Sequence, residues 1–193
     1  METLAKIFQS TYRVKLMRLF IFNPQNVYSV NEIVTTSRIS KAQALKEIKI
    51  LESAGFIKKM RSEEQKVNVY GIDGKFPLIE PLKSLIIDSE LIRTKDIAEK
   101  FINVGVIKML FLSGIFTKNE QRLVDIFIVG DKVDKNKFLK AMMILEAEIG
   151  KELRYCLFTP EEYLYRVNMH DSLVLDVMNF PHERIIDKMT SPK

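Results

Sequence analysis

The sequence predicts a mixed α and β fold, with an α+β domain at the N-terminus and a small α/β domain at the C-terminus. Apolar residues follow helical spacing and then strand alternation over the first 75 residues, whereas strands and helices alternate after residue 105. A length of 193 residues, of which 47% are apolar, gives room for two cores. Turn-forming residues divide the chain into 1–76, a helical linker at 77–104, and 105–193.

The first domain is expected to begin with two helices. An apolar face predicts a helix over 3–22, which an Asn-Pro turn ends. Ser29 and Glu32 form a capping box, in which each side chain bonds the backbone N–H of the other residue. This box predicts a short helix over about 30–37.

A longer helix and a β-hairpin follow. Ser40 and Gln43 repeat the capping box, and a helix is expected from Lys41 to about residue 54, where Gly55 ends it. Strand-like alternation predicts strands over 56–60 and 66–72, with a polar hairpin tip at 61–65.

The basic residues are concentrated in the first domain. Residues 1–75 hold 13 Lys and Arg against 7 Asp and Glu, whereas residues 76–193 hold 17 against 18. This asymmetry favours a domain that faces nucleic acid, joined to a neutral domain. A solvated basic face would give the same count, so charge alone leaves both interpretations open.

The predicted order of helix, short helix, turn, longer helix and hairpin is that of a winged helix–turn–helix. The stretch SKAQALKEIKILESAGFIKK resembles the recognition helix and first wing strand of arsenic-repressor-like and related bacterial and archaeal regulators, and the resemblance covers about residues 10–75. The family's signature is found at Ile48, Leu51, Glu52, Ala54, Gly55 and Phe56, which pack or cap and so report the fold. The resemblance implies binding of double-stranded DNA.

In this fold, the N-terminal residues of the second helix reach base edges in the major groove. Gln43 could bond adenine through both amide atoms, and it is expected to share one exposed face with Lys41 and Lys46. Leu45 departs from the polar residue common there, and it could touch a thymine methyl or pack against a partner. The candidate DNA contacts are Ser40, Lys41, Gln43, Lys46 and Lys49 from this helix, and Lys58, Lys59, Arg61 and Lys66 from the wing.

The second half predicts a small α/β unit. Apolar runs predict strands over 106–113, 123–129 and 153–158, and helical spacing predicts a helix over 134–150. Another helix opens after Thr159, with proline at its first position and glutamate at its third.

The segment LFLSGIFTKNEQRLVDIFIVGD resembles the core of minimal nucleotidyltransferases, over about residues 95–180. In that family, glycine and serine hold the triphosphate, and two aspartates on one strand bind a pair of Mg²⁺ ions. This chain keeps Ser113 and Asp125 but has Leu112 in place of the glycine and Phe127 in place of the second aspartate. The resemblance implies a degenerate domain with a vestigial nucleotide site and no catalysis. Asp125 could instead be satisfied by backbone or by a cation, and Ser113 could be a cap or turn residue.

These features predict a DNA-binding transcription regulator whose second domain serves assembly or sensing. A homodimer is expected, with its interface on helices at 3–22 or 78–104. The alternatives are a nucleotidyltransferase that modifies a partner macromolecule and a winged helix that binds another protein.

Other site types are not expected. With two histidines and one cysteine, no metal site is predicted, and no cofactor is predicted either. The single Cys156 favours a cytoplasmic protein, and the short apolar runs predict no membrane contact. Nothing in the sequence identifies a small-molecule effector.

Overall fold

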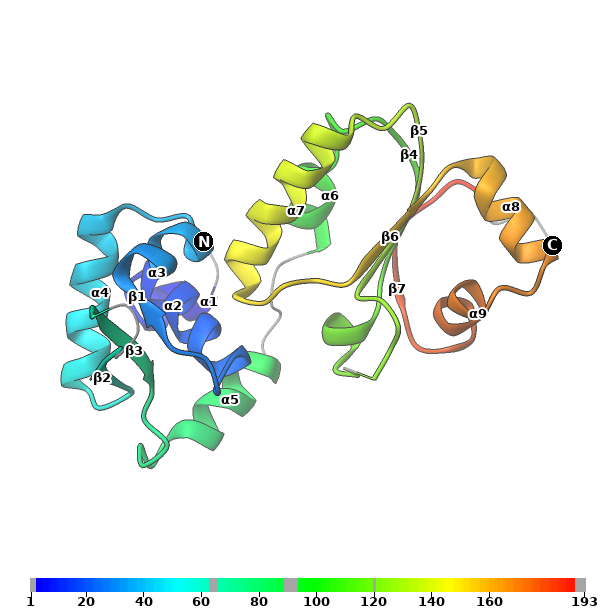
Figure 1. Cartoon of the computed structure of the whole chain (residues 1–193). Coiled ribbons are helices and arrows are strands. Elements are labelled where there is room, and N and C mark those ends of the chain that lie inside the picture. Colours follow the sequence, from blue (N-terminus) through cyan, green and yellow to red (C-terminus); the bar gives the residue numbers. More distant parts are fainter. Residues whose placement is uncertain (1–2, 63–65, 89–93, 120, 190–193) are drawn as a thin grey trace. The chain divides into compact units, whose positions relative to one another are not determined.

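The structure, a computed structural model, describes residues 3–62, 66–88, 94–119 and 121–189. Its contacts divide the chain into an N-terminal unit, Met1–Ile92 with Glu146–Lys151, and a C-terminal unit, Arg93–Leu145 with Glu152–Lys193 (Figure 1). Both units contain helices and strands, which confirms the mixed α and β composition. The helical segment expected at 77–104 is divided between the two units.

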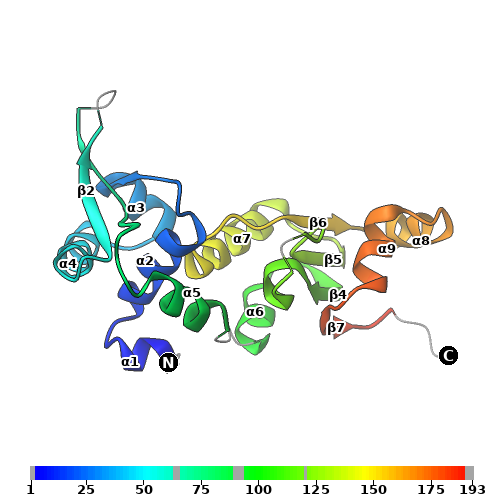
Figure 2. The same cartoon turned by 90° about the horizontal axis from the view of Figure 1, so that it is seen from below.

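The N-terminal unit combines helices with one small sheet. Its elements are α1 (Thr3–Ile7), α2 (Thr11–Phe22), β1 (Tyr28–Ser29), α3 (Val30–Ser37), α4 (Lys41–Ser53), β2 (Ile57–Arg61), β3 (Asn68–Ile72) and α5 (Ile79–Asp88). The strands pair antiparallel in the order β1-β3-β2. Figure 2 shows the β2–β3 hairpin extending beyond α3 and α4. The predicted tip at 61–65 includes residues 63–65, which lie outside the described residues.

Both predicted capping boxes are confirmed. The Ser29 hydroxyl accepts a hydrogen bond from the Glu32 N–H, and the Glu32 carboxylate accepts one from the Ser29 N–H. Ser40 and Gln43 do the same at the start of α4. Gly55 follows α4 with φ +76°, a left-handed conformation that glycine adopts at little cost.

The single helix predicted over 3–22 is wrong, because the chain breaks between α1 and α2. Gln9 has φ +56°, and Ser10 is extended and caps α2 by accepting a hydrogen bond from the Arg13 N–H. The apolar spacing continues through the break, so periodicity alone conceals it.

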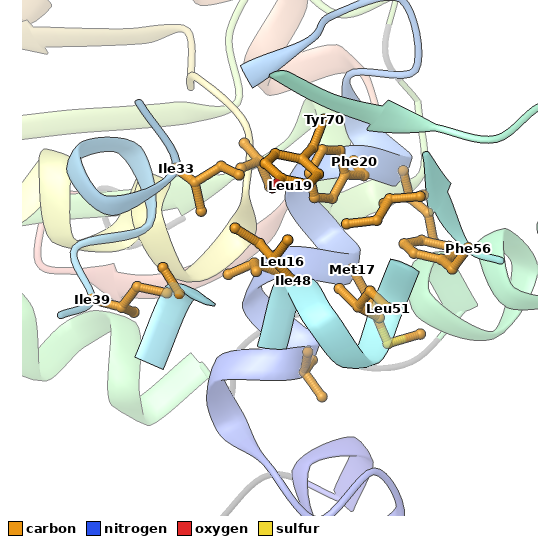
Figure 3. Packing of buried hydrophobic residues seen from close by; sticks show 14 of the residues in the cluster. Leu16, Met17, Leu19, Phe20, Ile33, Ile39, Ile48, Leu51, Phe56 and Tyr70 are labelled. Atoms are coloured by element: carbon orange, nitrogen blue, oxygen red, sulfur yellow. The ribbon is translucent and has the colours of Figure 1, made fainter. Parts of the chain in front are cut away.

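The core of this unit gathers around α2. Leu16, Leu19 and Phe20 are almost fully buried, and residues from α3, α4 and the hairpin pack on them (Figure 3). The main partners are Ile33, Ile48, Leu51, Phe56 and Tyr70. Burying this apolar surface is the main force that holds α4 and the hairpin to α2.

A buried polar cluster adds a specific link between α4 and the start of α2. The Glu47 carboxylate accepts hydrogen bonds from Ser10 Oγ at 2.7 Å and from Arg13 Nε at 2.8 Å. Arg13 also donates to the Phe8 carbonyl at 2.9 Å. Glu47 is therefore fully paired, as a carboxylate on the buried side of a helix must be.

The C-terminal unit contains a four-stranded sheet. Its elements are α6 (Thr94–Lys100), β4 (Val106–Leu112), the 3-10 helix η1 (Gly114–Thr117), β5 (Ile126–Asp131), α7 (Lys135–Ile149), β6 (Tyr155–Phe158), α8 (Pro160–Asn168), α9 (Ser172–Asn179) and β7 (Glu183–Asp187). The end of α7, from Glu146 on, is grouped with the N-terminal unit. The strand order is β6-β5-β4-β7, and α7 joins the parallel pair β5 and β6. Figure 1 shows α6 and α7 on one face of the sheet and α8 and α9 on the other. Neither β1 in the N-terminal unit nor α9 and β7 in this unit was predicted from the sequence.

Removing the Glu47 carboxylate should destabilise the N-terminal unit. We expect Glu47→Ala to lower its free energy of unfolding by about 2–4 kcal/mol, because Arg13 and Ser10 lose their acceptor. Glu47→Gln, which keeps one acceptor, should cost less. Urea unfolding followed by circular dichroism measures the change. Glu52→Ala, at an exposed position on the same helix, is the control and should change stability by under about 0.5 kcal/mol. A Glu47→Ala effect equal to that of the control would contradict the role of the cluster.

Candidate nucleic-acid interface

One side of α4 is buried and the opposite side is exposed to solvent. Ala44, Glu47, Ile48 and Leu51 are buried against the rest of the N-terminal unit. On the opposite side the helix exposes Lys41, Ala42, Leu45, Lys46 and Lys49. With 100° between successive residues, these five side chains span an arc of about 140°. The helix thus presents a basic face to solvent.

Gln43 does not belong to that face. It is half-buried and lies two residues from Lys41, which is about 160° around the helix. Its Oε1 accepts from the Ser40 N–H at 3.1 Å and from Ser40 Oγ at 2.9 Å. The expectation that Gln43 shares one exposed face with Lys41 and Lys46 is therefore wrong for Lys41, whereas Lys46 lies only about 60° from Gln43 around the helix. A bidentate contact with adenine would need the same carbonyl oxygen, so Gln43 could read a base only by giving up the cap.

The register of β2 and β3 shows on which face of the sheet each cation of the hairpin lies. Lys59 lies opposite Tyr70, and Arg61 lies opposite Asn68. Side chains alternate along a strand, so Lys59 and Arg61 share the face that carries Ile57 and Tyr70, which pack on the helices. Lys58 lies on the other face. Lys59 and Arg61 therefore extend the helix-side face of the sheet toward the tip.

These cations are available to a partner. Lys58, Lys59, Arg61 and Lys66 are exposed, as are Ser40 and the lysines of α4. Lys66 precedes β3 with φ +53°. Within the described part of the chain, no carboxylate pairs with a lysine of α4 or with a cation of the hairpin. The acidic residue on the exposed side of α4 is Glu52, which lies at the C-terminal end of that helix. Burial, and to a smaller degree the charge of Glu52, raises the pKa of Tyr70.

The residues expected to form a vestigial nucleotide site are bonded to the protein itself. Asp125 is buried, and its two carboxylate oxygens accept four hydrogen bonds. Oδ1 accepts from the Ile115 N–H at 3.0 Å and from Arg154 Nη2 at 2.9 Å. Oδ2 accepts from the Arg154 N–H at 2.9 Å and from Arg154 Nε at 3.1 Å. Burial raises the pKa of Asp125, but these bonds outweigh it and hold the pKa below its usual value.

Ser113 has a similar structural role. Its hydroxyl donates to the Val124 carbonyl at 2.6 Å, and its N–H donates to the Asp125 carbonyl at 2.9 Å. The next residue, Gly114, has φ +56°, and a side chain there would collide with Asp125 Oδ1. Ser113 and Asp125 thus fit the structural alternatives, a turn residue and a carboxylate held by a cation. Sequence reasoning missed Gly114 and Arg154, which complete this cluster.

Minimal nucleotidyltransferases have a second aspartate where this chain has Phe127, and the Phe127 ring lies in the core. Phe127 is fully buried and contacts the rings of Phe111, Phe158 and Tyr163. Burial also raises the pKa of Cys156 to about 12, which keeps its thiol protonated and a poor metal ligand. Among the described residues, no group of three or more His, Cys, Asp or Glu side chains is arranged to hold a metal ion.

Comparison with protein-family models, with curated proteins and with solved structures gave no match to this chain. The described helices include none that is long and apolar enough to cross a membrane. The resemblance to winged-helix regulators therefore stays a prediction carried by the residues named above.

The stabilising effect of Asp125 should disappear in acid. Its pKa is lower in the folded chain than in the unfolded one, so the ionised carboxylate stabilises the fold above the unfolded value near 4. This contribution is lost as the pH falls through the folded value. Asp125→Asn should lower stability by about 1–3 kcal/mol at pH 7 and by clearly less at pH 3. Unfolding at both pH values measures the difference. Asp131→Asn, at the exposed C-terminal end of β5, the strand that Asp125 directly precedes, is the control. A loss of equal size at both pH values would contradict this account.

Proposed function

We propose that this chain is a transcription regulator that binds double-stranded DNA through a winged helix–turn–helix. The observation that carries the proposal is the basic face of α4, which lies next to a hairpin with its own exposed cations. In this proposal α3 and α4 are the helix–turn–helix, α4 is the recognition helix, and β2 and β3 form the wing.

The order of the elements supports the winged-helix fold. A strand precedes α3, a hairpin follows α4, and the three strands pair in the order β1-β3-β2. The turn between α3 and α4 passes through Arg38 in a left-handed conformation, with φ +52°, and ends at the Ser40 cap. This turn leaves the N-terminal end of α4 exposed, as insertion into a major groove requires.

The charges support DNA rather than a protein as the partner. Lys41, Lys46 and Lys49 point outward, and Lys59 and Arg61 lie on the helix-side face of the wing. Cations without carboxylate partners can replace the counterions around phosphates, and this gives salt-dependent affinity. A protein-binding winged helix is the competing proposal, and binding that is insensitive to salt would favour it.

We propose that the C-terminal unit serves assembly or sensing and does not transfer nucleotides. Asp125 is bonded on both oxygens, and Phe127 lies in the core, so this strand offers no free carboxylate pair for two metal ions. If the parent chain incorporates a labelled nucleotide and the Asp125→Ala variant does not, this proposal is wrong.

We also propose that the chain acts in the cytoplasm as a homodimer. A dimer would place two recognition helices on half-sites about 34–36 Å apart, or a multiple of that. The exposed Ile7 of α1 and Leu85 of α5 support a helical interface. A monomer by light scattering, with and without DNA, would refute the dimer.

The wing cations should contribute unequally. We expect Lys59→Ala and Arg61→Ala to weaken binding to all DNA sequences and to reduce the slope of affinity against salt by about one unit each. Lys58→Ala is the matched control, because it removes the same charge one residue away on the other face of the sheet. Fluorescence anisotropy on a random-sequence duplex at several salt concentrations measures the slopes. Equal slopes for the Lys58 and Lys59 variants would show that the face does not matter.

Gln43 should act through the helix cap and not through a base. Gln43→Glu keeps an oxygen for the Ser40 N–H but lacks the amide donor that adenine N7 needs. The added negative charge weakens binding to all sequences. The informative quantity is therefore the ratio of specific to non-specific affinity, which should stay unchanged. A fall in this ratio of about tenfold or more, with stability preserved, would restore Gln43 as a base contact.

A further inference from the structure

The basic face of α4 has an apolar centre. Leu45 is 46% exposed and lies midway, in sequence and around the helix, between Lys41 and Lys49. Ala42, also exposed, lies close to this row. In the proposed complex this face enters the major groove, so binding would displace the water around the Leu45 side chain.

Side-chain length separates the roles on this face. Lysine has a long stem whose charged end can reach phosphates at the edge of the groove, whereas leucine and alanine contact only what lies beneath them. The one amide near the N-terminal end of α4, that of Gln43, has its oxygen bonded to Ser40. The Ser40 hydroxyl is bonded to Gln43 as well. Leu45 and Ala42 are therefore the short side chains of α4 left to face the bases.

The chemistry of the groove then selects the base. Base edges in the major groove carry hydrogen-bond donors and acceptors, and the apolar group among them is the 5-methyl of thymine. A leucine pressed against a donor or acceptor would leave that group without a hydrogen-bond partner and shielded from water, which costs binding free energy. Against a thymine methyl, the same leucine buries apolar surface on both sides.

We infer that Leu45 is a specificity-determining residue, and that the preferred DNA carries a thymine whose 5-methyl group contacts it. This inference rests on the proposed function, since it concerns the same DNA-binding face. It adds a property of the partner: recognition depends on a methyl group in the major groove.

The test uses duplexes selected from a random-sequence pool by the full chain. Each thymine of the tightest duplex is replaced in turn by deoxyuridine, which removes only the methyl group. At one or two positions the parent chain should lose about fourfold in affinity per methyl. Leu45→Ala should bind the thymine duplex more weakly and show a smaller loss on replacement, whereas Leu45→Met should keep most of the discrimination.

Leu139→Ala is the matched control, because Leu139 is 46% exposed, as Leu45 is, and lies on α7, outside the DNA-binding face and outside the helices proposed for the dimer interface. It should keep the full thymine preference. Alanine favours helix, so neither alanine variant should unfold. If the pool yields no enriched duplex and no salt-dependent binding, the proposed function and this inference both fail. If a duplex is bound but no thymine methyl affects the parent chain, or if Leu45→Ala keeps the parent's discrimination, this inference alone fails.

Discussion

The pairing of Glu47 with Ser10 and Arg13 is the constraint on which the rest of the N-terminal unit depends. A buried carboxylate is costly unless its oxygens are bonded, so α4 can sit on α2 only where Ser10 and Arg13 reach it. Apolar packing alone would tolerate rotation or sliding of a helix, because it is not directional. The ion pair removes that freedom, and fixing the buried side of α4 also fixes which residues the opposite side presents.

The C-terminal unit uses the same principle at a different place. Asp125 and Arg154 tie the start of β5 to the segment before β6, and the Ile115 N–H adds the turn after β4. In both units a buried carboxylate meets an arginine from a distant part of the chain. In both, the bonds of the acidic group hold together segments that are far apart in the sequence.

Local signals were the predictable part of this fold. Capping boxes and the glycine after α4 depend on residues within four positions of one another, and the structure confirms them. The break before α2 has only half of that signal: Ser10 caps the helix, but the third residue is Arg13 and not glutamate or glutamine. The partner of the Ser10 hydroxyl is Glu47, 37 residues later. Likewise, β7 is short and mostly half-buried, so its alternation is weak, and its place is set by pairing with β4. For Gln43 the sequence predicted two roles, and the structure shows that they compete for one oxygen.

The close approach of Gly114 to Asp125 limits the residues that position 114 can accept. Any side chain at position 114 would collide with the carboxylate, so position 114 can accept a larger residue only after Asp125 has changed. Folding alone is therefore enough to keep a glycine at position 114 for as long as an aspartate occupies position 125. A glycine and an aspartate found together at these two positions in another chain would thus indicate the same packing, and would be no evidence of a bound nucleotide.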